Sequence, residues 1–142
     1  MARVGLLEDN SRVAKLCATM LNFAGHQVTI YGHPKECLQA LFSSGLLQGD
    51  ICAVQEGLKG STLPVEVLIL DLHLPDITGL EVLRHLQSYP HTRSLPLIFC
   101  TAATDSEVAR ALQIAPRAGL VAKPFKLQTL VSAISTVLQT AY

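Results

Sequence analysis

The sequence has no tryptophan, few other aromatic residues and no long apolar segment. Aromatic side chains make up 5% of the 142 residues, and charged side chains make up 15%. No stretch approaches the roughly 20 apolar residues that a membrane-spanning helix needs, so we expect no membrane partner. Basic and acidic residues number 11 each, so the basic surface that is typical of a nucleic-acid-binding protein is not expected either.

The cysteines form no metal-binding or redox pattern. They are Cys17, Cys37, Cys52 and Cys100, with no Cys-x-x-Cys pair among them. Three of them lie in apolar contexts, and buried free thiols in a reducing cytoplasm are the simplest interpretation. The amino-terminal residues reach two acids almost at once, which is not typical of a signal peptide. We therefore expect a cytoplasmic protein.

Apolar residues are plentiful enough for one packed core. They make up 49% of the chain, which is too high for a disordered protein. The length suits one domain with a single core, so we expect one domain over residues 1–142.

Strand-like and helix-like patterns alternate along the chain. Short apolar runs predict strands at 3–7, 27–31, 67–71, 96–101 and 119–122. Apolar residues at helical spacing predict helices at 11–24, 34–42, 79–87, 104–114 and 127–138. Such alternation is typical of a parallel sheet with helices on both faces and right-handed crossovers. The predicted fold class is a doubly wound α/β domain with five strands and five helices.

Residues 43–66 do not fit this alternation. Four glycines break the stretch, and residues 51–54 form a small apolar patch. We expect a long connection between the second helix and the third strand, with a short strand or helical turn at most. This connection should lie at the edge of the sheet where the strands begin. A tolerated surface insertion and a partner-binding surface are both open interpretations.

Polar residues follow the predicted strands where these strands end. The clearest case is the apolar run at 67–70, which leads directly into Asp71. Open α/β sheets place their ligand sites at this edge, outside the carboxyl ends of the strands. The other strand ends carry Glu8, Asp9, Thr101 and Lys123.

This set of side chains suits phosphoryl transfer. Crowded carboxylates repel one another, and a divalent cation with a nearby lysine would relieve the repulsion. Mg²⁺ prefers oxygen ligands, uses few protein carboxylates and keeps several waters. An aspartate beside Mg²⁺, with a lysine and a hydroxyl opposite, can attack a phosphoryl group and hold it as an aspartyl phosphate.

With these motifs in this order, the chain resembles the receiver domain of two-component response regulators. The motifs are Glu8-Asp9, the segment from Asp71 to Gly79, Thr101-Ala102 and Lys123-Pro124-Phe125. The resemblance covers the chain apart from residues 43–66. It implies a flavodoxin-like, CheY-like fold with strand order 2-1-3-4-5. It also implies a sensor histidine kinase or histidine phosphotransfer protein as phosphoryl source, and a downstream protein or effector domain as output.

The resemblance further implies a metal site. Asp9 and Asp71 would bind Mg²⁺ directly, together with the backbone carbonyl of His73. Glu8 would act mainly through ordered water.

The phosphoryl group has its own expected partners. By the resemblance, Asp71 is the phosphoryl acceptor, Thr101 hydrogen-bonds a phosphoryl oxygen and Lys123 pairs with the phosphoryl group. The Lys123–Pro124 peptide bond is expected to be cis, as it usually is in the family.

Two departures from the family pattern bear on output and lifetime. Leu120 stands where many members have an aromatic switch residue, so that switch is not expected here. The face formed by 104–114, 119–122 and 127–138 looks apolar, which favours partner docking or a homodimer there. Ala103 has no polar atom to position water, and His73 is large enough to shield the phosphoryl group. Slow dephosphorylation is therefore expected.

Two other functions remain open from the residues alone. Phosphatases of the haloacid dehalogenase type also use an aspartyl phosphate and Mg²⁺. Their motif is Asp-x-Asp, with a second aspartate two residues after the nucleophile, whereas this chain has His73 at that position. A pseudo-receiver would bind partners without phosphorylation, but the retained site residues argue against it. We therefore expect a signalling switch rather than a classical enzyme.

Overall fold

The computed structural model describes residues 2–48, 63–73, 78–102 and 105–139, with the backbone alone for 43–48. Its five strands form one parallel sheet in the order β2-β1-β3-β4-β5, as predicted. The strands are β1 (Arg3–Leu7), β2 (Gln27–Tyr31), β3 (Val67–Leu70), β4 (Leu97–Thr101) and β5 (Gly119–Ala122). The helices are α1 (Ser11–Phe23), α2 (Pro34–Gln48), α3 (Gly79–Ser88), α4 (Pro90–Arg93), α5 (Asp105–Ile114) and α6 (Leu127–Gln139).

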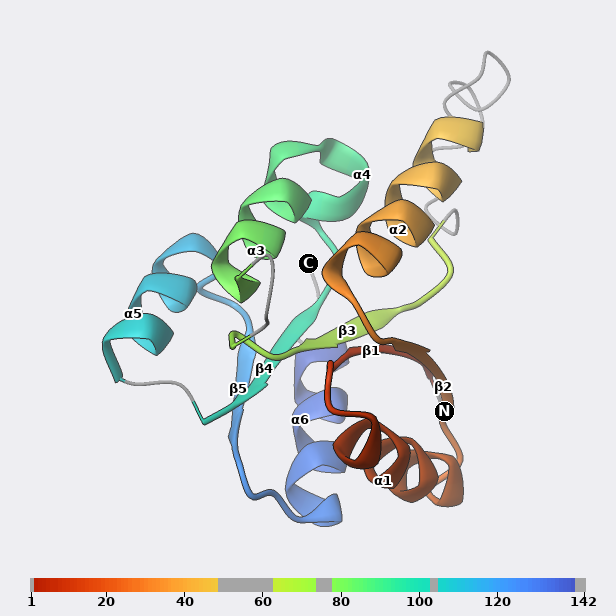
Figure 1. Ribbon diagram of the computed structural model, residues 1–142, viewed down its shortest axis with the longest axis vertical. Helices are drawn as coiled ribbons and strands as arrows, with labels where there is room; N and C mark the ends of the chain where they lie inside the picture. Colours follow the sequence, from red (N-terminus) through yellow and green to blue (C-terminus); the bar gives the residue numbers. More distant parts are fainter. Residues whose placement is uncertain (1, 49–62, 74–77, 103–104, 140–142) are drawn as a thin grey trace.

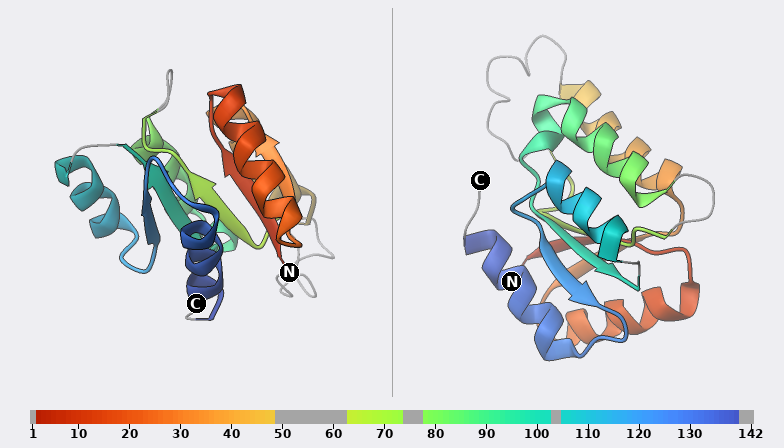
Figure 2. Two further views of the ribbon diagram at one scale, coloured as in Figure 1. Left: turned by 90° about the horizontal axis from the view of Figure 1, so that it is seen from below. Right: turned by 90° about the vertical axis from the view of Figure 1, so that its left-hand side faces the viewer.

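The sheet lies between two layers of helices (Figures 1 and 2). Helices α1 and α6 cover one face, and α2, α3, α4 and α5 cover the other. None of the helices in the described ranges is long and apolar enough to cross a membrane.

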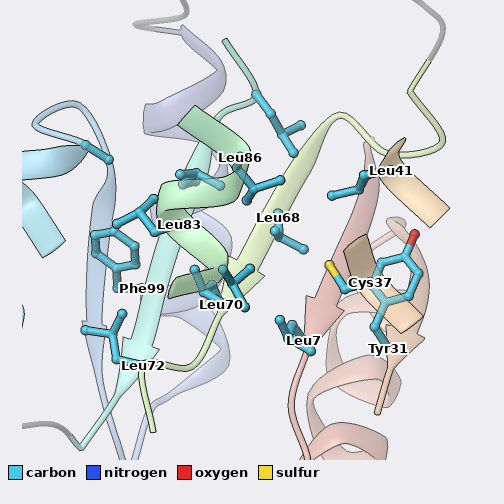
Figure 3. Packing of buried hydrophobic residues seen from close by; sticks show 14 of the residues in the cluster. Leu7, Tyr31, Cys37, Leu41, Leu68, Leu70, Leu72, Leu83, Leu86 and Phe99 are labelled. Atoms are coloured by element: carbon cyan, nitrogen blue, oxygen red, sulfur yellow. The ribbon is translucent and has the colours of Figure 1, made fainter. Parts of the chain in front are cut away.

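The central strand β3 explains why this architecture forms. All four of its residues are buried, because each face of the strand packs against a helical layer. Leu68 and Leu70 point into the core beneath α2, α3 and α5, which Figure 3 shows. Val67 and Ile69 point into the second core, beneath α1 and α6. The sequence reads as a continuous apolar run for this reason.

Helix α1 begins and ends where the sequence predicts. The side chain of Asn10 accepts hydrogen bonds from the backbone N–H groups of Arg12 and Val13, at 3.0 and 3.2 Å. These bonds satisfy two of the amide groups that a helix leaves unpaired at its start. Beyond the helix, Gly25 has a φ of 98°, a conformation that glycine adopts without strain.

The described ranges contain six helices rather than the five predicted. Pro90, which follows the predicted helix at 79–87, is the first residue of the four-residue helix α4. Proline suits that position because the first helical N–H has no intrahelical partner anyway. The buried Thr92 then ties α4 to α3, since its hydroxyl donates to the carbonyl of Leu86 at 2.6 Å.

The predicted connection at 43–66 is partly wrong. Helix α2 continues to Gln48, so the first six residues of that stretch are helical. A glycine inside a helix costs only about 1 kcal/mol, and leucine and glutamine favour helix, so Gly45 does not end α2. Residues 49–62 lie outside the described part of the chain. The flanks that are described, the end of α2 and the start of β3, lie at the edge of the sheet where the strands begin.

The described cysteines have a structural role. Cys17, Cys37 and Cys100 are free and buried, which confirms the expectation for those three. Burial raises the pKa of Cys17 and Cys37 to about 12 and that of Cys100 to about 11. Thiols in such surroundings stay protonated and act as small apolar side chains. Cys52 lies outside the described residues.

Candidate functional site

Three carboxylates meet at the edge of the sheet where β1 and β3 end. The backbone N–H of Glu8 donates to the carbonyl of Tyr31, and that of Asp71 donates to the carbonyl of Leu7, at 3.1 and 3.3 Å. The sheet's hydrogen bonding thus continues one residue beyond each strand and fixes both side chains. Glu8, Asp9 and Asp71 each have one carboxylate oxygen that lies within 4.8 Å of the corresponding oxygens of the other two.

Lys123 brings a positive charge into this cluster. Its Nζ lies 2.7 Å from Oε1 of Glu8 and 2.8 Å from Oδ2 of Asp71. The lysine follows β5, and its backbone N–H donates to the carbonyl of Thr101 at 3.2 Å. The Lys123–Pro124 peptide bond is cis, as predicted.

The cluster is largely shielded from water, so its charges act strongly. Glu8 and Asp71 are 4% and 5% exposed, and the Lys123 side chain is 22% exposed. Buried carboxylates require a partner of opposite charge, and Lys123 supplies one to both. Asp9 differs from Glu8 and Asp71 because it is exposed. The solvent-facing side of the cluster is therefore the side of Asp9.

The lysine is held in its charged form. Burial lowers the pKa of Lys123, but hydrogen bonds to Asp71 and Glu8 and the charges of these carboxylates outweigh it and raise that pKa. When the pKa of a lysine is higher in the folded state than in the unfolded state, its charged form stabilises the fold. This stabilisation is complete at pH values below the pKa of the unfolded state. That contribution is lost as the pH rises through the folded pKa. The pairing is therefore fully present at neutral pH.

The donor set fits a small divalent cation. Three carboxylates and one ammonium group leave an excess of two negative charges in a space a few ångströms across. Oxygen donors of this kind are the ligands that Mg²⁺ prefers. The carboxylates of Glu8, Asp9 and Asp71 are the groups that could hold the ion or its waters.

His73 joins this site through its backbone and reaches out of it through its side chain. The backbone N–H donates to Oδ1 of Asp71 at 2.9 Å. The imidazole Nε2 lies 2.8 and 3.0 Å from the two carboxylate oxygens of Glu107 in α5. Glu107 is not among the site residues that the sequence predicts.

Thr101 is the last residue of β4, which pairs with β3. It is buried, and the pairing of Leu70 with Phe99 places Thr101 one residue further along the sheet edge than Asp71. The strand ends thus present Thr101, Asp71 and Lys123 on one edge, as the sequence predicts. Ala103, the other residue expected to affect phosphoryl lifetime, lies outside the described residues.

Gly79 packs directly against the backbone of Asp71 and Leu72. A Cβ atom at this position would lie 2.4 Å from Cα of Leu72 and 2.6 Å from the carbonyl oxygen of Asp71. The backbone of α3 therefore approaches the segment after β3 as closely as only glycine permits. Thr78 caps the start of α3 and forms a capping box with Glu81, a motif that was not predicted from the sequence.

Comparisons with known proteins agree with this fold. The response regulator receiver domain family matches residues 4–135. The chain is 36% identical to the phosphate regulon transcriptional regulatory protein PhoB of Rhizobium meliloti (strain 1021), over 99% of the chain and 54% of that protein. It is 30% identical to a probable cyclic di-GMP phosphodiesterase of Vibrio cholerae, over 54% of the chain and 17% of that protein. The chain thus spans about half of the first relative and less of the second.

Solved structures show the same architecture. The chain is similar to the bacteriophytochrome response regulator AtBRR, with a TM-score of 0.69 and 26% identity over 96% of the chain and 91% of that protein. A CheY-like receiver domain protein from Methanospirillum hungatei JF-1 gives a TM-score of 0.74 at 19% identity, over 99% and 95% of the two chains. The chain belongs to the family of response regulator receiver domains, which act as phosphorylation-dependent switches in two-component signalling.

Proposed function

We propose that this receiver domain accepts a phosphoryl group on Asp71 with the help of Mg²⁺. The donor is a sensor histidine kinase or a histidine phosphotransfer protein, and phosphorylation changes binding to a downstream protein or effector domain. One observation carries the proposal. The Asp71 carboxylate is buried at a strand end, 2.8 Å from the Lys123 ammonium group, with the Glu8 and Asp9 carboxylates beside it.

The residues divide the chemistry among them. An oxygen of the Asp71 carboxylate forms the bond to phosphorus as the bond between phosphorus and the donor atom breaks, so the electron pair of that bond leaves with the donor. The backbone N–H of His73 and the ammonium of Lys123 hold the two Asp71 oxygens in place. Lys123 is then positioned to pair with the transferred group, and Thr101 offers a hydroxyl at the neighbouring strand end.

Magnesium would be held on the open side of the cluster. Asp9, Asp71 and the backbone carbonyl of His73 would bind the ion directly, and Glu8 would act through ordered water. When bound, the ion neutralises the negative charge on the phosphoryl oxygens. Asp9 suits direct binding because it is exposed, whereas Glu8 is already paired with Lys123.

The competing functions fit the site less well. A phosphatase of the haloacid dehalogenase type would have an aspartate two residues after its nucleophile, but His73 occupies that place and contacts Glu107. A pseudo-receiver would not need Lys123 between two carboxylates. Receiver domains are signalling switches rather than classical enzymes.

Magnesium dependence tests the proposal. We expect acetyl phosphate to add the mass of one phosphoryl group to the protein when Mg²⁺ is present, and no mass when a chelator removes it. Intact-mass spectrometry over a magnesium titration measures both. A pseudo-receiver would gain no mass at any Mg²⁺ concentration. A phosphatase would hydrolyse small phosphate esters with many turnovers.

The two neighbouring acids should differ in this titration. Asp9→Ala is expected to raise the Mg²⁺ concentration for half-maximal labelling by roughly tenfold or more, because it removes a direct ligand. Glu8→Ala should raise it less, because Glu8 acts through water. Equal shifts in the two variants would contradict this assignment of the ligands.

The face formed by α5, β5 and α6 is the proposed surface for partner docking or self-association. Leu120 on β5 is 48% exposed, Ala109 and Ala122 are exposed, and Leu112 is half-buried. An exposed leucine among small apolar side chains is typical of an interface. This surface is the expected place for a homodimer or a downstream partner.

Leu120→Lys should weaken self-association of the phosphorylated protein. Burying a leucine contributes about 1.5–3 kcal/mol, so replacing it with a charge should raise the dimer dissociation constant by about tenfold or more. Sedimentation with and without a phosphoryl mimic measures this. Phe23→Lys is the matched control, because Phe23 is an exposed apolar residue on α1, which is not one of the three elements of this face. Equal weakening in both variants would mean that the α5–β5–α6 face is not the specific interface.

A further inference from the structure

A side-chain contact links the residue two places after Asp71 to helix α5. His73 and Glu107 are 34 residues apart in the chain, yet Nε2 of the imidazole lies 2.8 and 3.0 Å from the two carboxylate oxygens. With its hydrogen on Nε2, the ring donates to both oxygens. The contact joins the segment that follows β3 to the first turn of α5.

The same histidine is tied to the acceptor itself. Its backbone N–H donates to Oδ1 of Asp71 at 2.9 Å, so the base of the side chain is fixed beside the carboxylate. Its far end is fixed on α5 by Glu107. His73 is therefore anchored at Asp71 through its backbone and on the helix that follows Thr101 through its ring.

We propose that Glu107 is a positioning residue that holds the His73 imidazole across the opening above Asp71. The pair restricts the approach of water to the phosphorylated side chain and so lengthens the lifetime of the phosphoryl group. This inference rests on the proposed function. Hydrolysis requires a water oxygen to attack phosphorus in line with the bond to Asp71, which releases inorganic phosphate and restores the carboxylate. A ring fixed beside Asp71 narrows the space from which that water can come.

The solvent exposure of His73 and Glu107 limits how much this contact can change the rate of dephosphorylation. The side chains of His73 and Glu107 are 54% and 34% exposed. A contact between two partly exposed side chains contributes little free energy. It shifts the equilibrium between a held and a released imidazole by a factor of about five or less. Loss of Glu107 should therefore speed dephosphorylation by about two- to fivefold.

A decay time course tests the proposal. The protein is phosphorylated with acetyl phosphate and Mg²⁺, the donor is removed, and the phosphorylated fraction is followed by intact mass. We expect Glu107→Ala and His73→Ala each to decay faster than wild type. The double variant should decay no faster than the faster single variant, because Glu107 has no ring to hold once His73→Ala has removed it.

Two further variants separate positioning from a general structural effect. Glu107→Gln keeps an oxygen that can accept from Nε2, so its decay should be closer to wild type than that of Glu107→Ala. Asp105→Ala removes another acid from the first turn of α5, with the same loss of favourable charge near the helix start, and should decay as wild type. Melting temperatures of all variants show whether any of them is destabilised.

The outcomes are distinct. Decay in Glu107→Ala as slow as in wild type, or additive effects in the double variant, would overturn the role of Glu107. Slower decay in His73→Ala would overturn the shielding and show that the imidazole assists the attacking water. A wild-type protein that takes up no phosphoryl group would overturn the proposed function and this inference together.

Discussion

Asp71→Asn is expected to reduce phosphorylation by acetyl phosphate to background. The asparagine amide has nearly the shape of the carboxylate, but its oxygen carries no charge and is a poor nucleophile. The variant should remain folded, because Glu8 still pairs with Lys123 and the amide oxygen can still accept from His73. The cluster also loses one of its crowded carboxylates, so stability should change little.

Intact mass after incubation with acetyl phosphate and Mg²⁺ measures the effect of Asp71→Asn. Asp105→Asn is the matched control, since it makes the same chemical change at an exposed position on α5. We expect full labelling of that control and none of Asp71→Asn. A mass increase that persists in Asp71→Asn would place the acceptor elsewhere.

Gly79→Ala is expected to have the largest effect on stability. The added methyl carbon would lie 2.4 Å from Cα of Leu72 and 2.6 Å from the carbonyl oxygen of Asp71. Both are backbone atoms, so no side chain can rotate away and the backbone itself must move. Overpacking of this kind costs about 1–3 kcal/mol and occasionally more, and we expect the upper end of that range. The movement displaces the segment that carries Asp71, so labelling should also slow.

Chemical denaturation measures this loss, with Gly32→Ala as the control. No atom lies within 4 Å of a Cβ built on Gly32, and its backbone does not adopt the left-handed conformation. There the same substitution should be neutral or should stabilise the fold by up to about 1 kcal/mol, because alanine has less freedom in the unfolded chain. Equal free energies of unfolding in the two variants would show that α3 does not pack against the backbone of Asp71 and Leu72 as described.

The sheet could be predicted because its information is local. A strand buried on both faces reads as an apolar run, and in a parallel sheet the polar residues that follow such runs share one edge. Asp71 and Lys123 lie 52 residues apart, yet this rule predicts that they share one edge of the sheet, and their side chains are 2.8 Å apart.

Other features could not be predicted because they depend on packing. Helix α4 is stabilised by the hydrogen bond from the Thr92 hydroxyl to the carbonyl of Leu86, and no local pattern in the sequence predicts that contact. The same holds for His73 and Glu107. The sequence shows an acid in the first turn of a helix, but only the fold shows that a histidine after β3 reaches it.

The central claim is that Asp71 carries the phosphoryl group, and locating that group tests the claim most directly. Wild-type protein is labelled with acetyl phosphate and Mg²⁺ and treated with borohydride, which reduces an aspartyl phosphate to homoserine. The protein is then digested, and its peptides are sequenced by mass spectrometry. We predict homoserine at position 71 and at no other acidic position. Homoserine at position 9, hydroxynorvaline (the reduction product of a glutamyl phosphate) at position 8, or a labelled protein with an unmodified Asp71 would contradict the account.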